Sequence, residues 1–112
     1  MSIVKDLASN AQADIDLLRL RDRQGDVFAR HRSVDFVFVS EDEAQASAVA
    51  GFLSDYQYAT TMLTSSGGDY RVVATISMSV EQQVILSVSG FMTCIAALFQ
   101  VSYDGWGAPI IG

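Results

Sequence analysis

Apolar and polar residues alternate along this chain with two different periods, and the changes of period divide it into helices and strands. From Ile3 to Arg23, apolar residues recur every three or four positions, which predicts an amphipathic helix that packs on the rest of the domain. Gly25 follows, and glycine readily adopts the left-handed conformation that ends helices. The apolar stripe consists of Val4, Leu7, Ala11, Ile15 and Leu18, with Ser9, Asn10, Asp14 and Asp16 largely off it.

In the predicted strands, apolar residues recur at every second position. In "HRSVDFVFVS", residues 31–40, the pattern turns Val34, Phe36 and Phe38 to one side of a strand. Two further segments, "YQYATTML" and "DYRVVATISM", are rich in aromatic and β-branched residues and predict two more strands. Gly67-Gly68 between them predicts a tight hairpin turn. The glycine-rich "VSYDGWGAPII" at the end predicts a short last strand.

Two more helices are predicted, each opened by a capping box. Ser40 with Glu43 begins the first, and Ser79 with Gln82 begins the second, which runs from Val80 to about Gln100. The core sides predicted from the spacing are Ala46, Val49, Ala50 and Leu53 in the first helix, and Val84, Val88, Phe91, Ile95 and Leu98 in the second.

After the first helix the order is strand, helix, strand, strand, helix, strand. This order predicts an α+β fold, a ferredoxin-like βαββαβ sandwich with an extra N-terminal helix. We divide the chain into an N-terminal helix and connector, residues 1–32, and a ferredoxin-like domain, residues 33–112. The sheet face away from the core would carry Val37, Val39, Thr61, Val73 and Thr75. We expect the N-terminal helix or the C-terminal tail to cover it; a homodimer or partner interface is the alternative.

Length and composition narrow the class of protein. The chain has 112 residues, enough for one domain with a core of its own. Its single cysteine, Cys94, excludes an intramolecular disulfide and fits a reducing cytoplasm. The N-terminus lacks the pattern of a secretory signal. The uncharged run from Val84 to Phe99 has 16 residues, fewer than the roughly 20 that span a bilayer, so we expect a buried helix and no membrane contact.

The net charge of −6 is unevenly distributed. Residues 1–32 contain six basic and five acidic side chains, a balance of +1, whereas residues 33–112 contain only Arg71 against eight acidic side chains, a balance of −7. Such an acidic domain is unsuited to nucleic acid, because phosphate contacts dominate that affinity. It suits a basic protein partner.

The residues needed for catalysis or metal binding are scarce. His31 stands between two arginines and Cys94 among apolar residues, and neither has the partner that an activated nucleophile needs. Neighbouring carboxylates at 41–43 do not converge on one point, and Gly67-Gly68 precedes a strand instead of the helix that follows a phosphate loop. We read the arginines between Arg19 and Arg32 as a solvated helix end, with RNA contact as the alternative. No enzyme, cofactor or metal site is predicted.

The segment "YDGWG" contains the only tryptophan of the chain and comes directly after the last predicted helix. In this place after the βαββα order, it resembles the regulator of ribonuclease E activity B (RraB) family over roughly Ser33 to Pro109. The resemblance implies a cytoplasmic, non-enzymatic protein that binds ribonuclease E and inhibits it. The matching positions are Tyr103, Asp104, Gly105, Trp106 and Gly107. They either bind the partner or hold the last strand; we favour the second interpretation, because tryptophans near a domain edge commonly serve packing.

Our leading hypothesis is a small protein that binds ribonuclease E, or a related basic protein, through its acidic surface. A small-ligand-binding or enzymatic ferredoxin-like domain with a pocket around Trp106 is the competing hypothesis. An immunity or antitoxin-like protein with a different partner is a third.

Overall fold

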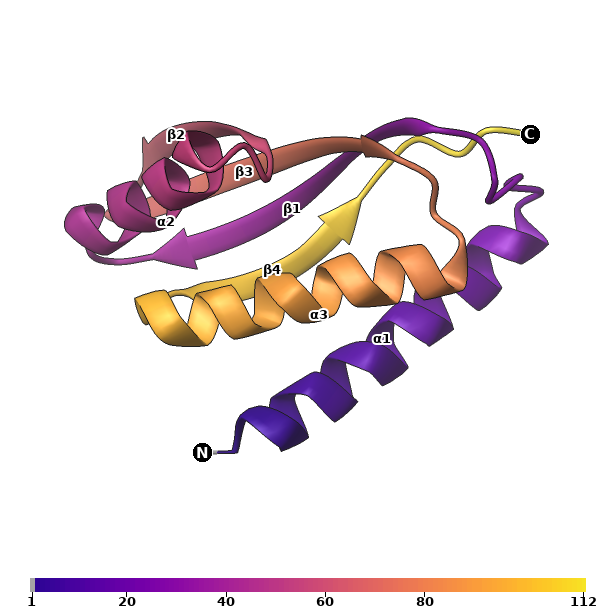
Figure 1. Cartoon of the computed structure of the whole chain (residues 1–112), viewed down its shortest axis with the longest axis horizontal. Helices are drawn as coiled ribbons and strands as arrows, with labels where there is room; N and C mark the ends of the chain where they lie inside the picture. Colours follow the sequence, from indigo (N-terminus) through magenta and orange to yellow (C-terminus); the bar gives the residue numbers. More distant parts are fainter. Residues whose placement is uncertain (1) are drawn as a thin grey trace.

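A computed structural model describes residues 2–112 and contains three helices and four strands (Figure 1). The strands form one antiparallel sheet in the order β2-β3-β1-β4. Helices α2 and α3 lie side by side on one face of this sheet, and α1 packs along the outer side of α3. The predicted ferredoxin-like sandwich with an extra N-terminal helix is therefore confirmed; the division at residue 32 stays a prediction. The elements are α1 (Ile3–Arg23), β1 (Arg32–Ser40), α2 (Glu43–Asp55), β2 (Thr60–Ser66), β3 (Asp69–Met78), α3 (Gln82–Phe99) and β4 (Ser102–Gly107).

The core lies between the sheet and the two helices. Val34, Phe36 and Phe38 of β1 are buried on the helix side, as the alternation predicts. Their partners on β3 are Ile76, Ala74 and Val72, in that order. Each large side chain removed from water in this way contributes about 1.5–3 kcal/mol to folding. The predicted face of α2 is buried as well. The hairpin is also confirmed, since Gly67 and Gly68 both have positive φ between β2 and β3.

Both helix starts differ from the predicted capping boxes. The N-cap of α2 is Asp42, whose side chain accepts a hydrogen bond from the Gln45 backbone N–H. Ser40 is still part of β1, so it stands two residues too early to cap the helix. Similarly, α3 begins at Gln82 rather than Val80, with Glu81 as its N-cap, and the backbone N–H of Val80 is bonded to the Phe28 carbonyl in the connector.

The predicted core side of α3 was right in part: Ile95 is buried and Val88 and Phe91 pack against the core, but the centre of the buried face is rotated by about one residue. The residues most fully buried on α3 are Ile85, Ser89 and Met92, whereas Val84 and Leu98 of the predicted stripe are exposed. An α-helix turns about 100° per residue, and α3 is apolar on both of these neighbouring faces, so the spacing alone could not choose between them. By length and hydropathy α3 could cross a membrane. In this structure it packs between the sheet and α1 instead.

The sheet face opposite the helices is not covered in the way we expected. Helix α1 packs on α3, on the helical side, and the C-terminal tail runs beside the connector (Figure 1). Val37, Val39 and Val73 are therefore partly exposed on this face. Thr61 was assigned to it wrongly: its hydroxyl donates to the Ala50 carbonyl of α2, so the side chain lies on the helix side.

Candidate functional site

A bulge in β4 shapes the YDGWG segment. Trp106 pairs with Phe36 and Tyr103 pairs with Phe38, so Asp104 and Gly105 together stand opposite the single residue Val37. Gly105 has φ +86°, a conformation that glycine adopts without strain. Side chains three residues apart on a regular strand point to opposite faces. The extra residue corrects this parity, so both rings lie on the helix side.

Trp106 joins the sheet to α1. Its side chain is only 8% exposed, and its indole Nε1 donates a hydrogen bond of 3.1 Å to Asp14 Oδ1. The guanidinium carbon of Arg21, two turns further along α1, lies 5.2 Å from the centroid of the ring, within cation–π range. The indole therefore has an apolar, a polar and a cationic contact, and two of these come from α1.

A chain of hydrogen-bonded polar side chains connects α1, α3 and β4. Asn10 Nδ2 donates to Asp14 Oδ2 at 3.3 Å and to Ser89 Oγ at 3.0 Å. The Ser89 and Tyr103 hydroxyls are 2.9 Å apart and share a hydrogen bond. Within residues 2–112, no buried side-chain nitrogen or oxygen lacks a partner. This network, comprising Asn10, Asp14, Ser89, Tyr103 and Trp106, holds α1 and α3 against β4.

Burial raises the pKa of the Asp14 carboxyl, and the hydrogen bonds around it lower the pKa by less. Burial likewise raises the pKa of the Tyr103 hydroxyl, which therefore stays protonated at neutral pH. Asp14 is an acid whose protonated form is favoured by folding. Its favourable contribution is full below the unfolded pKa and is lost as pH rises through the higher folded pKa.

The expected loss of stability with rising pH can be tested with Asp14→Asn, which keeps an acceptor for Trp106 but cannot ionise. Between about pH 3.5 and pH 7 we expect the free energy of unfolding of the wild type to fall relative to that of the variant. Urea titrations across this range measure the difference. Asp16→Asn, at an exposed position on the same helix, is the control and should show no such trend. A constant difference for Asp14→Asn would contradict the assignment.

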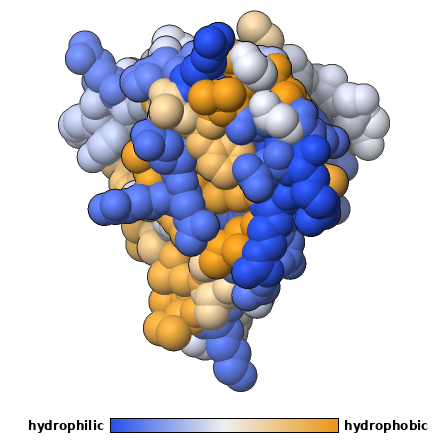
Figure 2. Space-filling view, turned by 90° about the vertical axis from the view of Figure 1, so that its right-hand side faces the viewer, coloured by the Kyte–Doolittle hydropathy of each residue, from blue (hydrophilic) through white to orange (hydrophobic). Residues whose placement is uncertain are grey.

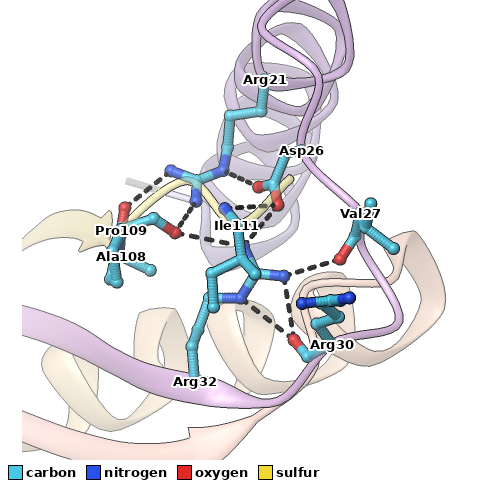
Figure 3. A network of polar contacts seen from close by, with 8 residues as sticks. All are labelled: Arg21, Asp26, Val27, Arg30, Arg32, Ala108, Pro109 and Ile111. Atoms are coloured by element: carbon cyan, nitrogen blue, oxygen red, sulfur yellow. Dashed lines mark hydrogen bonds and ion pairs between the residues drawn. The ribbon is translucent and has the colours of Figure 1, made fainter.

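Two buried arginines form a second cluster, around Asp26 in the connector (Figure 3). Arg21 Nε lies 2.9 Å from Asp26 Oδ2, and Arg32 Nη1 binds Asp26 Oδ1. The same arginines donate to the carbonyls of Ala108 and Pro109 in the tail. All three charged side chains are at least nine-tenths buried. The cluster therefore fastens the tail and the connector to the end of α1.

These contacts correct the prediction of a solvated arginine cluster. Arg21 and Arg32 are buried ion-pair partners, and only Arg19, Arg23 and Arg30 are exposed. Asn10, Asp14 and Ser89 were not predicted as site residues. One signal was available: Asn10, Asp14 and Arg21 follow one another at helical spacing, as a polar stripe beside the apolar one. That the stripe would be buried depended on which helix covered it.

The predicted motif residues separate into two groups. Tyr103 and Trp106 point into the domain, whereas Asp104 and Gly107 are exposed on β4. A hollow of about 410 Å³ between α1, α3 and β4 includes Asn10 and Tyr103 in its lining. The Tyr103 hydroxyl and the Asn10 amide nitrogen are already bonded to Ser89, and Trp106 does not line this hollow. The arrangement is therefore suited to holding elements together, not to binding a ligand at the indole.

Groups for catalysis are not assembled either. His31 is exposed in the connector, and Cys94 is half-buried in α3. In the described part of the chain, residues 2–112, no three side chains of His, Cys, Asp or Glu come together as metal ligands. A ligand set or a nucleophile with its base would need such convergence.

Comparison with protein families decides the assignment. The sequence model of the family described as regulator of ribonuclease activity B, RraB, matches residues 11–108. The chain belongs to the RraB family. The match begins in α1, before Asp14, and ends after β4, so it includes the bulge, Asp14, Trp106 and the three charged side chains of the Asp26 cluster. RraB proteins regulate ribonuclease activity, a role that is not itself catalytic. A comparison with curated proteins gave no match.

Proposed function

We propose that this RraB protein inhibits a ribonuclease, ribonuclease E or a related basic protein, by binding it through the acidic surface of residues 33–112. The observation that carries the proposal is the state of the acidic side chains. All eight are exposed, and none forms an ion pair with another side chain of residues 2–112. They are Asp35, Glu41, Asp42, Glu43, Asp55, Asp69, Glu81 and Asp104.

Part of this charge gathers at one end of the sheet. Glu41 and Asp42 follow β1, and Asp69 begins β3 beside them; the three contribute to the lining of a hollow of about 530 Å³ that includes no Lys or Arg. The arginines of α1 and the connector lie at the opposite end of the domain, where β1 begins (Figure 1). An unpaired negative field at one end speeds and orients the encounter with a basic protein surface.

The exposed basic residues favour a protein partner over RNA. Arg21 and Arg32 are buried in ion pairs with Asp26, and the exposed Arg19 pairs with Asp16 at 3.9 Å. The four other basic side chains of residues 2–112 are spread over α1, the connector and β3, whereas phosphate binding requires a dense cationic patch. The cytoplasmic location and the homodimer stay predictions.

The proposal is tested by calorimetric titration of the ribonuclease from the same source, at low and at moderate salt. Glu41→Gln/Asp69→Asn should weaken binding by roughly tenfold at low salt, and by less at moderate salt, since the Debye length at 0.1 M is only about 10 Å. RNA cleavage should slow in proportion to the complex formed.

A matched control removes the same charge elsewhere. Asp16→Asn/Asp22→Asn changes two exposed carboxylates of α1 and should leave the affinity unchanged. Equal losses for both double variants would show a general charge effect without an acidic docking surface. An absence of binding by the wild type at low salt would reject the proposal.

A further inference from the structure

The seam between α2 and α3 is apolar and aromatic, and part of it is open to solvent. Phe52 packs on Tyr56, Tyr58 and Phe99 with ring centroids 5.2–5.6 Å apart, and Tyr58 packs on Phe91 at 5.0 Å. Even so, 70% of Tyr56 and 48% of Tyr58 remain exposed. Tyrosines that are packed on one side and exposed to solvent on the other are enriched at protein interfaces.

Helix α3 contributes a second row of apolar side chains to this seam. Val84, Phe91 and Leu98 are seven residues apart and so share one face of α3, next to the face that fills the core. Leu98 is 77% exposed. Beside Phe91 and Tyr58 lies a hollow of about 350 Å³ without a charged side chain in its lining. Figure 2 views the molecule from the end at which the connector and the C-terminus lie, and apolar surface is visible there between polar flanks.

The two ends of the seam differ in charge. At one end Gln45 donates to Gln100 across the seam at 3.1 Å, and both residues line the acidic hollow next to Glu41 and Asp42. At the other end lie Tyr58 and Phe91 with the uncharged hollow. The 13 residues of α2 make the seam about 20 Å long, which corresponds to three or four turns of a helix.

Building on the proposed function, we propose that this seam is the docking site for an amphipathic helix of the ribonuclease. Its apolar face lies on Tyr58, Phe91 and Leu98, and Lys or Arg side chains at one of its ends reach the acidic hollow. The shape follows the helix-in-groove mode of recognition. The charge selects the partner: a second copy of this chain brings the same negative field, and an anionic lipid surface is repelled by it.

The test compares three exposed positions by calorimetric titration of the same ribonuclease. Leu98→Ser and Tyr58→Ser should each weaken binding by about tenfold, as for the loss of a central interface contact. Met62→Ser is the matched control: Met62 is 66% exposed on β2, on the sheet face away from the helices, and its loss should leave the affinity within about twofold. Melting curves check that all three variants fold.

The outcomes separate the seam from the proposed function. If Leu98→Ser and Tyr58→Ser bind like the wild type while Glu41→Gln/Asp69→Asn binds weakly, the seam is rejected and the acidic surface stands. Light scattering that shows a dimer abolished by Leu98→Ser would assign the seam to a second copy and overturn the inference. So would binding to anionic vesicles that Leu98→Ser abolishes.

If the ribonuclease does not bind the wild type, the proposed function fails, and a peptide then decides the seam. The probe is a 14-residue helical peptide with leucines on one face and three lysines in its last turn, or in its first. Saturable binding that Leu98→Ser weakens by about tenfold would support the seam. No binding of either peptide would overturn it.

Discussion

Trp106→Ala is expected to lower the free energy of unfolding by about 3–5 kcal/mol, the usual cost of removing a buried aromatic side chain. The ring is 8% exposed and contacts the sheet core and α1, so its loss leaves a cavity between them. It also leaves the buried Asp14 carboxylate without the indole donor. At about 4 °C per kcal/mol for a domain of this size, the melting temperature should fall by roughly 12–20 °C.

Two further variants separate the contributions. Trp106→Phe keeps much of the apolar area but loses the N–H group, so it should cost about 1–3 kcal/mol. Tyr56→Ala removes an aromatic side chain that is mostly exposed, and should change stability by less than about 1 kcal/mol. If Trp106→Ala melts like the wild type, the ring is not a structural joint, and its contribution should be sought in partner binding.

Asp26→Asn is expected to lower the free energy of unfolding by about 3–5 kcal/mol, because two buried guanidinium groups lose their counter-charge. The tail should loosen at the same time, since Ile111 N–H also donates to the Asp26 carboxylate. Chemical denaturation measures the first effect, and hydrogen exchange of the Ile111 amide measures the second. Asp22→Asn, exposed four residues earlier, should stay within about 0.5 kcal/mol of the wild type.

The dependence on pH gives this prediction a second readout. Burial alone would raise the pKa of Asp26, but the hydrogen bonds from Arg32, the Ile111 backbone and Arg21 together outweigh it and hold the pKa below the ordinary value of 3.8. A carboxyl whose pKa is lowered by folding contributes stability that is complete above the unfolded pKa and is lost as pH falls through the folded pKa. The gap between the wild type and Asp26→Asn should therefore narrow below about pH 4. A gap that does not change with pH would speak against an ionised Asp26.

The local pattern of this sequence was sufficient for the elements and their order. Period-two alternation placed Val34, Phe36 and Phe38 in the core, and Gly67-Gly68 placed the hairpin, because these signals depend on neighbouring residues alone. The YDGWG segment in its place after the last helix pointed to the RraB family, which the family match confirms. It did not reveal that Asp104 and Gly105 form a bulge.

Only the tertiary structure decided which polar residues are buried. Asp14 and Arg21 are ordinary surface residues by sequence, and they become buried because α1 lies across Trp106 and the tail. The buried face of α3 was likewise undecided, since two neighbouring faces are apolar and the core could accept either. In both cases the outcome depends on contacts between elements distant in the chain, such as the bond from Trp106 to Asp14. Local periodicity carries no information about such contacts, because it records how one element is built and not what packs against it.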